Sequence, residues 1–169
     1  MSARFVIEPL SARHDRTNFT CGIEALDRYL QLRANQDMKR RVSNCFVAVP
    51  EGGSGIAGYY TLAASGIPLG EIPPALARKL PRYPLLPAVL VGRLAVDRHF
   101  AGQSLGATLL YDAIARSARA DPAIYALIVD AKDENAASFY RHYGFQTFAG
   151  RPMSFYLTMA TGAKLISEP

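Results

Sequence analysis

Residues 90–108 read Leu90-Val-Gly-Arg-Leu-Ala-Val-Asp-Arg-His-Phe-Ala-Gly-Gln-Ser-Leu-Gly-Ala-Thr108. The first half is an apolar run with β-branched residues, which is typical of a buried strand. The chain then turns between Asp97 and Gly102, and a helix is predicted from apolar residues at four-residue steps: Leu105, Leu109 and Ala113. A glycine-containing loop before a helix leaves free backbone N–H groups at the helix's positive end, and these suit a phosphate. Many such loops contain glycine for steric reasons alone, so the loop by itself leaves both interpretations open.

Length and composition predict one globular domain over residues 1–169. Half of the 169 residues are hydrophobic and a fifth are charged, as in ordinary globular proteins. The longest apolar stretches are far shorter than the ~20 residues that span a bilayer. The N-terminus has no apolar signal-peptide core. We therefore expect a cytoplasmic protein without a membrane partner.

The net charge of +5 and a pI near 9.4 favour polyanionic partners. A pyrophosphate cofactor, RNA or an acidic protein would each fit, and so would a basic surface without a specific partner. Cys21 and Cys45 have no C-x-x-C spacing, and the three histidines are scattered. This pattern predicts free thiols and no metal site.

The pattern along the chain predicts a mixed α/β sheet with helices on its faces. An amphipathic helix is expected from near Thr20 to Lys39-Arg40-Arg41, on apolar residues from Ile23 to Met38. The glycines of 51–55 predict a hairpin turn. The remaining predicted elements are strands at 5–7, 45–49, 56–64, 124–129, 145–148 and 155–159, and helices at 105–120 and 134–143, the last capped by Asp133 and ended by Gly144.

Two basic segments each have a structural and a functional interpretation. Cations at 39–41 are favourable at the C-terminus of a helix, and they also suit RNA. Residues 66–87 hold six of the eleven prolines and carry Arg78, Lys79 and Arg82, with a helix-like piece only at 75–80. So long a connection is usually functional, although a packed spacer explains it equally well.

Three stretches together resemble a known family. They are Pro9–Leu30, the loop region Leu94–Ala107, and Asn135-Ala-Ala-Ser-Phe-Tyr-Arg-His-Tyr-Gly-Phe145. Over nearly its whole length the chain resembles the GNAT (Gcn5-related) N-acetyltransferases, most closely the GNAT-type toxins of bacterial type II toxin–antitoxin systems. The resemblance implies a single-domain α/β acyl-CoA N-acyltransferase fold, with a mixed and mostly antiparallel sheet flanked by helices. It also implies acetyl-CoA as the acetyl donor.

The resemblance assigns the cofactor-binding residues. Main-chain groups of Leu94, Ala95 and Val96 would pair with the pantetheine arm, and Asn135 would lie near the sulfur. The pyrophosphate would be held by the loop residues Gly102, Gln103, Ser104, Leu105, Gly106 and Ala107. This loop departs from the family pattern Q/R-x-x-G-x-G/A, because Ala101 replaces the Gln/Arg and Ser104 the first glycine. Backbone amides remain, so the departure affects cofactor affinity rather than identity.

The same match makes Tyr140 the expected general acid for the leaving thiolate, since a phenol with an ordinary pKa of ~10 is protonated at neutral pH. Phe139 and Tyr143 are expected in the core. No dedicated base is evident, because Glu134, Asp97 and His99 are better explained as caps or loop residues. An α-amine, with a pKa of ~7.7–8.0, needs less help than lysine. The α-amino group of aminoacyl-tRNA fits this requirement, and the toxin resemblance implies the same substrate.

Basic residues are then expected to contact tRNA phosphates. The candidates are Arg93, which leads, and Lys39, Arg40, Arg78 and Arg82. The resemblance further implies a small antitoxin, usually of the ribbon-helix-helix type, and suggests a homodimer. Two alternatives remain: a GNAT enzyme that acetylates a small-molecule amine or a protein N-terminus, and a non-catalytic GNAT module that binds acetyl-CoA.

Overall fold

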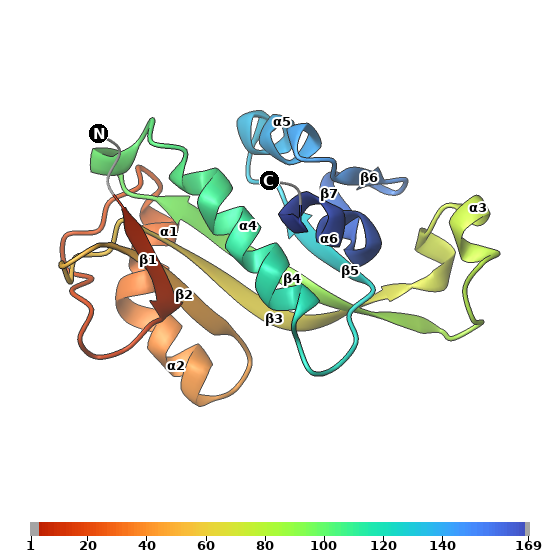
Figure 1. The fold of residues 1–169 in the computed structure, drawn as a ribbon, viewed down its shortest axis with the longest axis horizontal. Coiled ribbons are helices and arrows are strands. Elements are labelled where there is room, and N and C mark those ends of the chain that lie inside the picture. The colour runs from red at the N-terminus through yellow and green to blue at the C-terminus, as the bar shows by residue number, and fades with distance from the viewer. Residues whose placement is uncertain (1–3, 168–169) are drawn as a thin grey trace. The chain divides into compact units, whose positions relative to one another are not determined.

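In the computed structural model, which describes residues 4–167, strands form one seven-stranded mixed sheet (Figure 1). The strands are β1 (Phe5–Pro9), β2 (Asn44–Pro50), β3 (Gly58–Pro68), β4 (Leu85–Val96), β5 (Ala126–Asp130), β6 (Gln146–Phe148) and β7 (Arg151–Thr158). Their order in the sheet is β1-β2-β3-β4-β5-β7-β6. The β4–β5 pair is parallel, whereas β1–β2, β2–β3, β5–β7 and β6–β7 are antiparallel. The expected mixed, mostly antiparallel sheet is confirmed.

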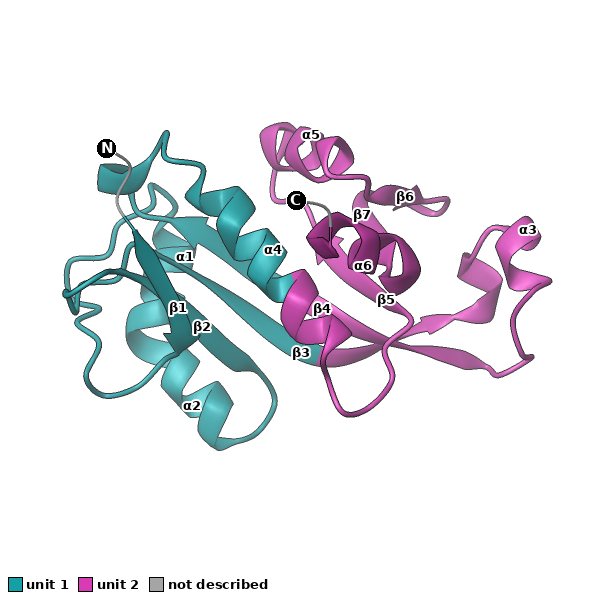
Figure 2. Ribbon diagram, in the orientation of Figure 1, with its two compact units in different colours: residues 1–63, 92–113 teal, residues 64–91, 114–169 magenta. Residues whose placement is uncertain are grey.

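Helices and helical turns connect the strands. The α-helices are α1 (Glu24–Arg28), α2 (Ala34–Lys39), α3 (Pro74–Ala77), α4 (Leu105–Ala118), α5 (Glu134–His142) and α6 (Met159–Ser167). One turn of π-helix, η1 (Tyr29–Arg33), joins α1 to α2, and the single 3₁₀ turns are η2 (Leu69–Glu71) and η3 (Arg98–Phe100). The chain divides into two compact units, residues 1–63 with 92–113 and residues 64–91 with 114–169 (Figure 2).

In the first unit, the helical segment from α1 to α2 packs its apolar stripe against β2 and β3. Leu30 and Ala34 are fully buried there. The Tyr59 hydroxyl donates to the Leu26 carbonyl at 2.6 Å, which fastens this segment to β3. The predicted helix thus exists, but it begins at Glu24 rather than at Thr20, and η1 interrupts it. It ends at Lys39, and Arg41 takes a left-handed φ of 60° just beyond it.

In the second unit, β5 is buried along its first four residues, in agreement with the apolar run that predicted it. The α5 boundaries also follow the sequence: the Asp133 carboxylate accepts from the Ala136 N–H at 2.8 Å, and Gly144 has a φ of 92°. Only glycine takes this conformation without strain, so the helix ends there.

Two predictions in this unit are wrong. The irregular excursion was expected over 66–87, but β3 continues to Pro68 and β4 begins at Leu85, which leaves 69–84 between them. A strand was predicted at 155–159 with no helix after it, but β7 ends at Thr158 and α6 follows it directly. This helix packs closely at Gly162, where a Cβ would lie 3.2 Å from Ile114 and 2.8 Å from the end of the Met159 side chain.

Within residues 4–167, no helix is long and apolar enough to cross a membrane. Nor do His, Cys, Asp and Glu side chains gather there in threes that could hold a metal ion. Neither Cys21 nor Cys45 forms a disulfide bond with any residue in this range.

Candidate functional site

The loop between β4 and α4, in the first unit, presents a row of main-chain amides. Gly102 has a φ of 80° and Ser104 a φ of 59°, so the backbone bends twice through the left-handed region before the helix begins. The Ser104 carbonyl accepts the first helical bond, from the Thr108 N–H at 3.1 Å. No oxygen of the described residues accepts from the N–H groups of 102–107. This geometry suits a diphosphate, which needs several donors at the positive end of a helix.

The start of the loop is fixed by Asp97, the residue that follows β4 and caps η3. Its carboxylate is buried and accepts from the Thr20 N–H at 2.9 Å, the His99 N–H at 2.9 Å and the His99 ring Nδ1 at 2.7 Å. Burial alone would raise the pKa of Asp97, but these hydrogen bonds outweigh it and lower the pKa below its ordinary value. Asp97 is therefore a cap that orients the loop, as expected, rather than a base.

Gln103 contributes an unusual polar group to the loop. Its side-chain Oε1 is buried and has no hydrogen-bond partner among the described residues. The two ends of a glutamine amide exchange by a simple flip, which would place the Nε2 donor at the same point. An unpartnered amide beside a row of free N–H groups is consistent with an anionic ligand at this loop.

The main chain of Leu94, Ala95 and Val96 continues β4 beyond its pairing with β5. That pairing runs from Ala88↔Ala126 to Val91↔Val129, whereas β4 extends to Val96. On the neighbouring strand, a Cβ at Gly58 would lie 3.0 Å from the Ala95 carbonyl oxygen, so only glycine allows this approach. The three predicted pantetheine-binding residues thus form one extended segment that leads into the loop.

Arg93, the leading candidate for tRNA contact, lies at the start of this segment and is half-buried. Its guanidinium carbon lies 3.5 Å from the ring centroid of Tyr29 on η1. The Tyr29 hydroxyl donates to the Asp37 carboxylate at 2.8 Å. Burial and this hydrogen bond raise the pKa of Tyr29 to about 12. Arg93 therefore has a fixed orientation before any ligand arrives.

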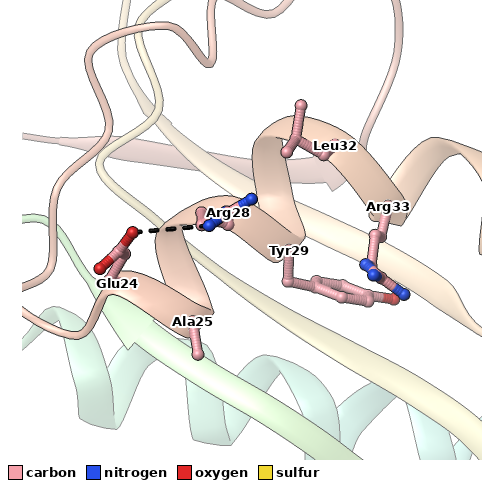
Figure 3. A pocket seen from close by; sticks show the side chains of 6 residues that line it. All are labelled: Glu24, Ala25, Arg28, Tyr29, Leu32 and Arg33. Atoms are coloured by element: carbon pink, nitrogen blue, oxygen red, sulfur yellow. Dashed lines mark ion pairs between the residues drawn. The ribbon is translucent and has the colours of Figure 1, made fainter.

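Tyr29 also lines a hollow of about 430 Å³ on the first unit (Figure 3). Arg28 and Arg33 lie on its walls, with Leu32, whose side chain is 59% exposed, between them. Glu24 pairs with Arg28 at 3.6 Å. The sequence analysis did not predict this hollow. Leu32 could have indicated it, because this leucine lies outside the apolar stripe of the predicted helix. Its combination of guanidinium groups and apolar surface suits an anion with an attached apolar group.

The other predicted tRNA-binding residues are exposed and belong to different parts of the chain. Lys39 and Arg40 lie at the end of α2 in the first unit, and Arg78 and Arg82 lie between α3 and β4 in the second.

In the second unit, Tyr140 lies on α5 and is only 6% exposed. Its ring packs against Phe139, Phe145 and Phe155 at centroid distances of 5.4, 5.5 and 6.3 Å. Burial and the nearby Asp130 carboxylate raise the pKa of Tyr140 to about 12. The phenol is therefore protonated at any neutral pH, as an acid requires.

The aromatic assignments on α5 need one correction. Phe139 and Tyr143 were expected to be the core pair, but both are half-buried, whereas Tyr140 is buried together with Ala137. The buried side of α5 therefore carries Ala137 and Tyr140, which are three residues apart. Asn135 is exposed in the first turn of α5, and Glu134 forms an ion pair with Arg141 at 2.9 Å.

Comparison with known proteins agrees with this geometry. The family model of the GNAT acetyltransferase domain matches residues 87–156. A protein of Mycobacterium tuberculosis (strain ATCC 25618 / H37Rv), named tRNA-acetylating toxin, is 34% identical over 161 residues, covering 94% of this chain and 95% of its own. The probable toxin TacT of Sinorhizobium fredii (strain NBRC 101917 / NGR234) is 28% identical over 170 residues, covering 95% and 94%.

Solved structures with the same fold include AtaT complexed with acetyl-methionyl-tRNAfMet. It has a TM-score of 0.89 and 29% identity, covering 97% of this chain and 100% of its own. AtaTR bound with acetyl-CoA has a TM-score of 0.85 and 29% identity, covering 99% and 100%. The extended segment of β4, its loop of free amides and the likeness along almost the entire chain lead to one conclusion: this chain belongs to the GNAT family of acetyltransferases, in the branch that contains the tRNA-acetylating toxins.

Proposed function

We propose that this chain transfers the acetyl group of acetyl-CoA to the α-amino group of aminoacyl-tRNA and thereby blocks translation. The observation that carries the proposal is the 34% identity, over 94% of the chain, to a tRNA-acetylating toxin. The AtaT structure with acetyl-methionyl-tRNAfMet supports the same product chemistry. Residues 1–169 would act as one catalytic domain.

Acetyl-CoA supplies an activated acyl thioester. The N–H groups of Gly102, Gln103, Ser104, Leu105, Gly106 and Ala107 would hold its diphosphate. Main-chain groups of Leu94, Ala95 and Val96 would pair with the pantetheine arm, and one of their N–H groups would donate to the thioester carbonyl and so stabilise the oxyanion charge. Asn135 would donate near the sulfur. The free amides of the loop are the feature of the chain that supports this assignment.

Tyr140 would return a proton to the thiolate as the C–S bond breaks. Its raised pKa keeps the proton on the phenol in the resting enzyme. The attacking amine needs no strong base, because an aminoacyl α-amine with a pKa of ~7.7–8.0 is partly neutral at physiological pH. The ion pair of Glu134 and the capping role of Asp97 leave neither carboxylate assigned to proton abstraction.

Phosphate contacts would come from Arg93, Lys39, Arg40, Arg78 and Arg82. Arg28 and Arg33, at the hollow of the first unit, join them as candidates. A small antitoxin would neutralise the enzyme, since AtaT is also known bound to the C-terminus of the antitoxin AtaR. We assign this antitoxin to the ribbon-helix-helix class, and we infer a homodimer acting in the cytoplasm, where aminoacyl-tRNA is found.

The direct test incubates the purified chain with labelled acetyl-CoA and a complete set of charged tRNAs. We expect label on the amino acid of one or more aminoacyl-tRNAs. Mild alkali, which hydrolyses the ester between the amino acid and the tRNA, should release this label from the tRNA. Transfer to free amines or protein N-termini, but to no aminoacyl-tRNA, would overturn the proposal. Tyr140→Phe serves as the inactive control.

A further inference from the structure

The segment between β3 and β4, residues 69–84, has an apolar face and a basic, aromatic face. We call it the arm; it contains η2 and α3 and lies wholly in the second unit (Figures 1 and 2). Resting on the proposed function, we infer that the outer face of the arm binds the tRNA substrate, with Tyr83 stacking on an unpaired nucleotide and Lys79 and Arg82 holding phosphates.

The inner face fixes the arm in place. Ile72 is buried, and Leu69, Leu76, Ala77 and Leu80 pack against the core formed by β3, β4, β5 and β7. The Leu69 N–H donates to the Pro84 carbonyl at 3.3 Å, which closes the base of the arm. Glu71 pairs with Arg151 on β7 at 2.7 Å, and Arg151 lies 4.5 Å above the ring of Phe148. These contacts hold the arm against the sheet of the second unit.

The outer face of the arm carries exposed aromatic and basic side chains. Tyr83 is 62% exposed, and Leu85 beside it is 58% exposed. Arg78, Lys79 and Arg82 are also exposed, and none of them forms an ion pair with a residue in the range 4–167 that the structure describes. The one acidic residue of the arm, Glu71, is already paired with Arg151. Three exposed cations thus lie within five residues of an exposed aromatic ring in the sequence, and the arm carries no unpaired acid.

This chemistry favours single-stranded RNA over a second copy of the chain. Aromatic rings stack on unpaired bases of any sequence, and neighbouring cations hold the phosphates. An isologous contact between two copies would instead bring two sets of three cations toward each other, which is unfavourable. A tRNA offers both phosphates and unpaired bases, and it is the substrate of the proposed reaction.

The test measures binding of the full-length chain to deacylated bulk tRNA over a range of salt concentrations. We expect Tyr83→Ala to weaken the affinity about tenfold while leaving the salt slope unchanged, and Tyr83→Phe to retain wild-type affinity. Arg82→Gln and Lys79→Gln should each reduce the salt slope by about one. Arg119→Gln, an exposed cation at the end of α4 outside the arm, is the matched control and should bind as wild type.

Sedimentation velocity of the same variants completes the test. Wild-type affinity in Tyr83→Ala overturns the inference, and so does a loss of affinity that occurs only together with a change of oligomeric state, which would make the arm a contact between copies. Because deacylated tRNA undergoes no reaction, the result is separate from the proposed function. Binding through the arm without acetyl transfer would refute the function alone, and transfer with arm variants that bind normally would refute the arm alone.

Discussion

The guanidinium of Arg93 lies 3.5 Å above the ring of Tyr29, and this contact joins β4 to η1. The ring is held in turn by the bond from its hydroxyl to Asp37. A cation stacked in this way is partly desolvated and keeps one rotamer, so it presents its remaining N–H donors without a further loss of entropy.

We therefore expect Arg93→Ala and Tyr29→Leu to be coupled. In a double-mutant cycle followed by urea unfolding, the coupling free energy should be about 0.5–2 kcal/mol. The control is Tyr29→Phe, which keeps the ring and loses only the bond to Asp37. Arg93→Ala should lower the free energy of unfolding by the same amount in the Tyr29→Phe background as in wild type. Strictly additive effects of Arg93→Ala and Tyr29→Leu would show that the stacking contributes nothing.

Tyr140→Phe should remove activity without removing the fold. The ring keeps its contacts with Phe145 and Phe155, so the free energy of unfolding should change by less than about 0.5 kcal/mol. Loss of the acid should lower kcat about 10²- to 10⁴-fold and leave the KM for acetyl-CoA near wild type. Tyr143→Phe, at the residue that follows the same helix, is the matched variant and should remain active. Comparable kcat values for the two variants would remove Tyr140 from the mechanism.

The raised pKa of Tyr140 predicts a loss of stability in alkali. Between the ordinary tyrosine pKa of ~10 and the native value of about 12, the unfolded chain releases this proton and the folded chain keeps it. The unfolding free energy should therefore be independent of this group below pH 10 and fall by about 1.4 kcal/mol per pH unit above it. Denaturant titrations of wild type and Tyr140→Phe at several pH values measure the difference. If the difference in unfolding free energy between wild type and Tyr140→Phe is the same at pH 9 and pH 11, the pKa of Tyr140 is not raised by burial.

Ser104 provides a test of the departure in the cofactor loop. A serine at a φ of 59° is strained, so Ser104→Gly should raise the free energy of unfolding by about 1 kcal/mol. If the serine hydroxyl assists the diphosphate, Ser104→Ala should bind acetyl-CoA less tightly than Ser104→Gly does. Calorimetric titration with acetyl-CoA separates the two effects. Lower stability of the glycine variant would show that the hydroxyl compensates for the strain.

Much of this fold could be predicted because local signals agree with tertiary structure. The caps of α5, Asp133 and Gly144, are visible in the sequence and set both of its ends. A loop suited to phosphate was predicted from strand, glycine and helix in succession, and the family resemblance assigned residues 102–107 to it. Its left-handed serine explains why the family prefers glycine at that position.

The predictions that failed depend on tertiary contacts. Helix α6 contains Gly162, a poor helix former, and packs closely against Ile114 at this residue, a contact that local sequence does not show. Its one local signal is Thr158, whose hydroxyl accepts from the Thr161 N–H at 3.3 Å. Tyr140 is buried next to Phe145 and Phe155, a tertiary contact that the sequence pattern of α5 does not reveal. The stacking of Arg93 on Tyr29 joins residues 64 positions apart, and no periodicity encodes it.

The π-helical turn at Tyr29–Arg33 has a consequence for the evolution of this chain. A wider turn holds one residue more than an α-helical turn, so the segment tolerates an extra amino acid while Leu30 and Ala34 both remain buried. Removing a single residue from it would restore regular α-helical winding, and the helix beyond would keep its orientation because the wide turn had absorbed that residue. Ala34 would stay in the interior, but the hollow beside Tyr29, which Leu32 and Arg33 also line, would be rebuilt from different side chains. Single-residue length changes at this turn would thus alter the shape of that hollow while the sheet beneath it stays the same.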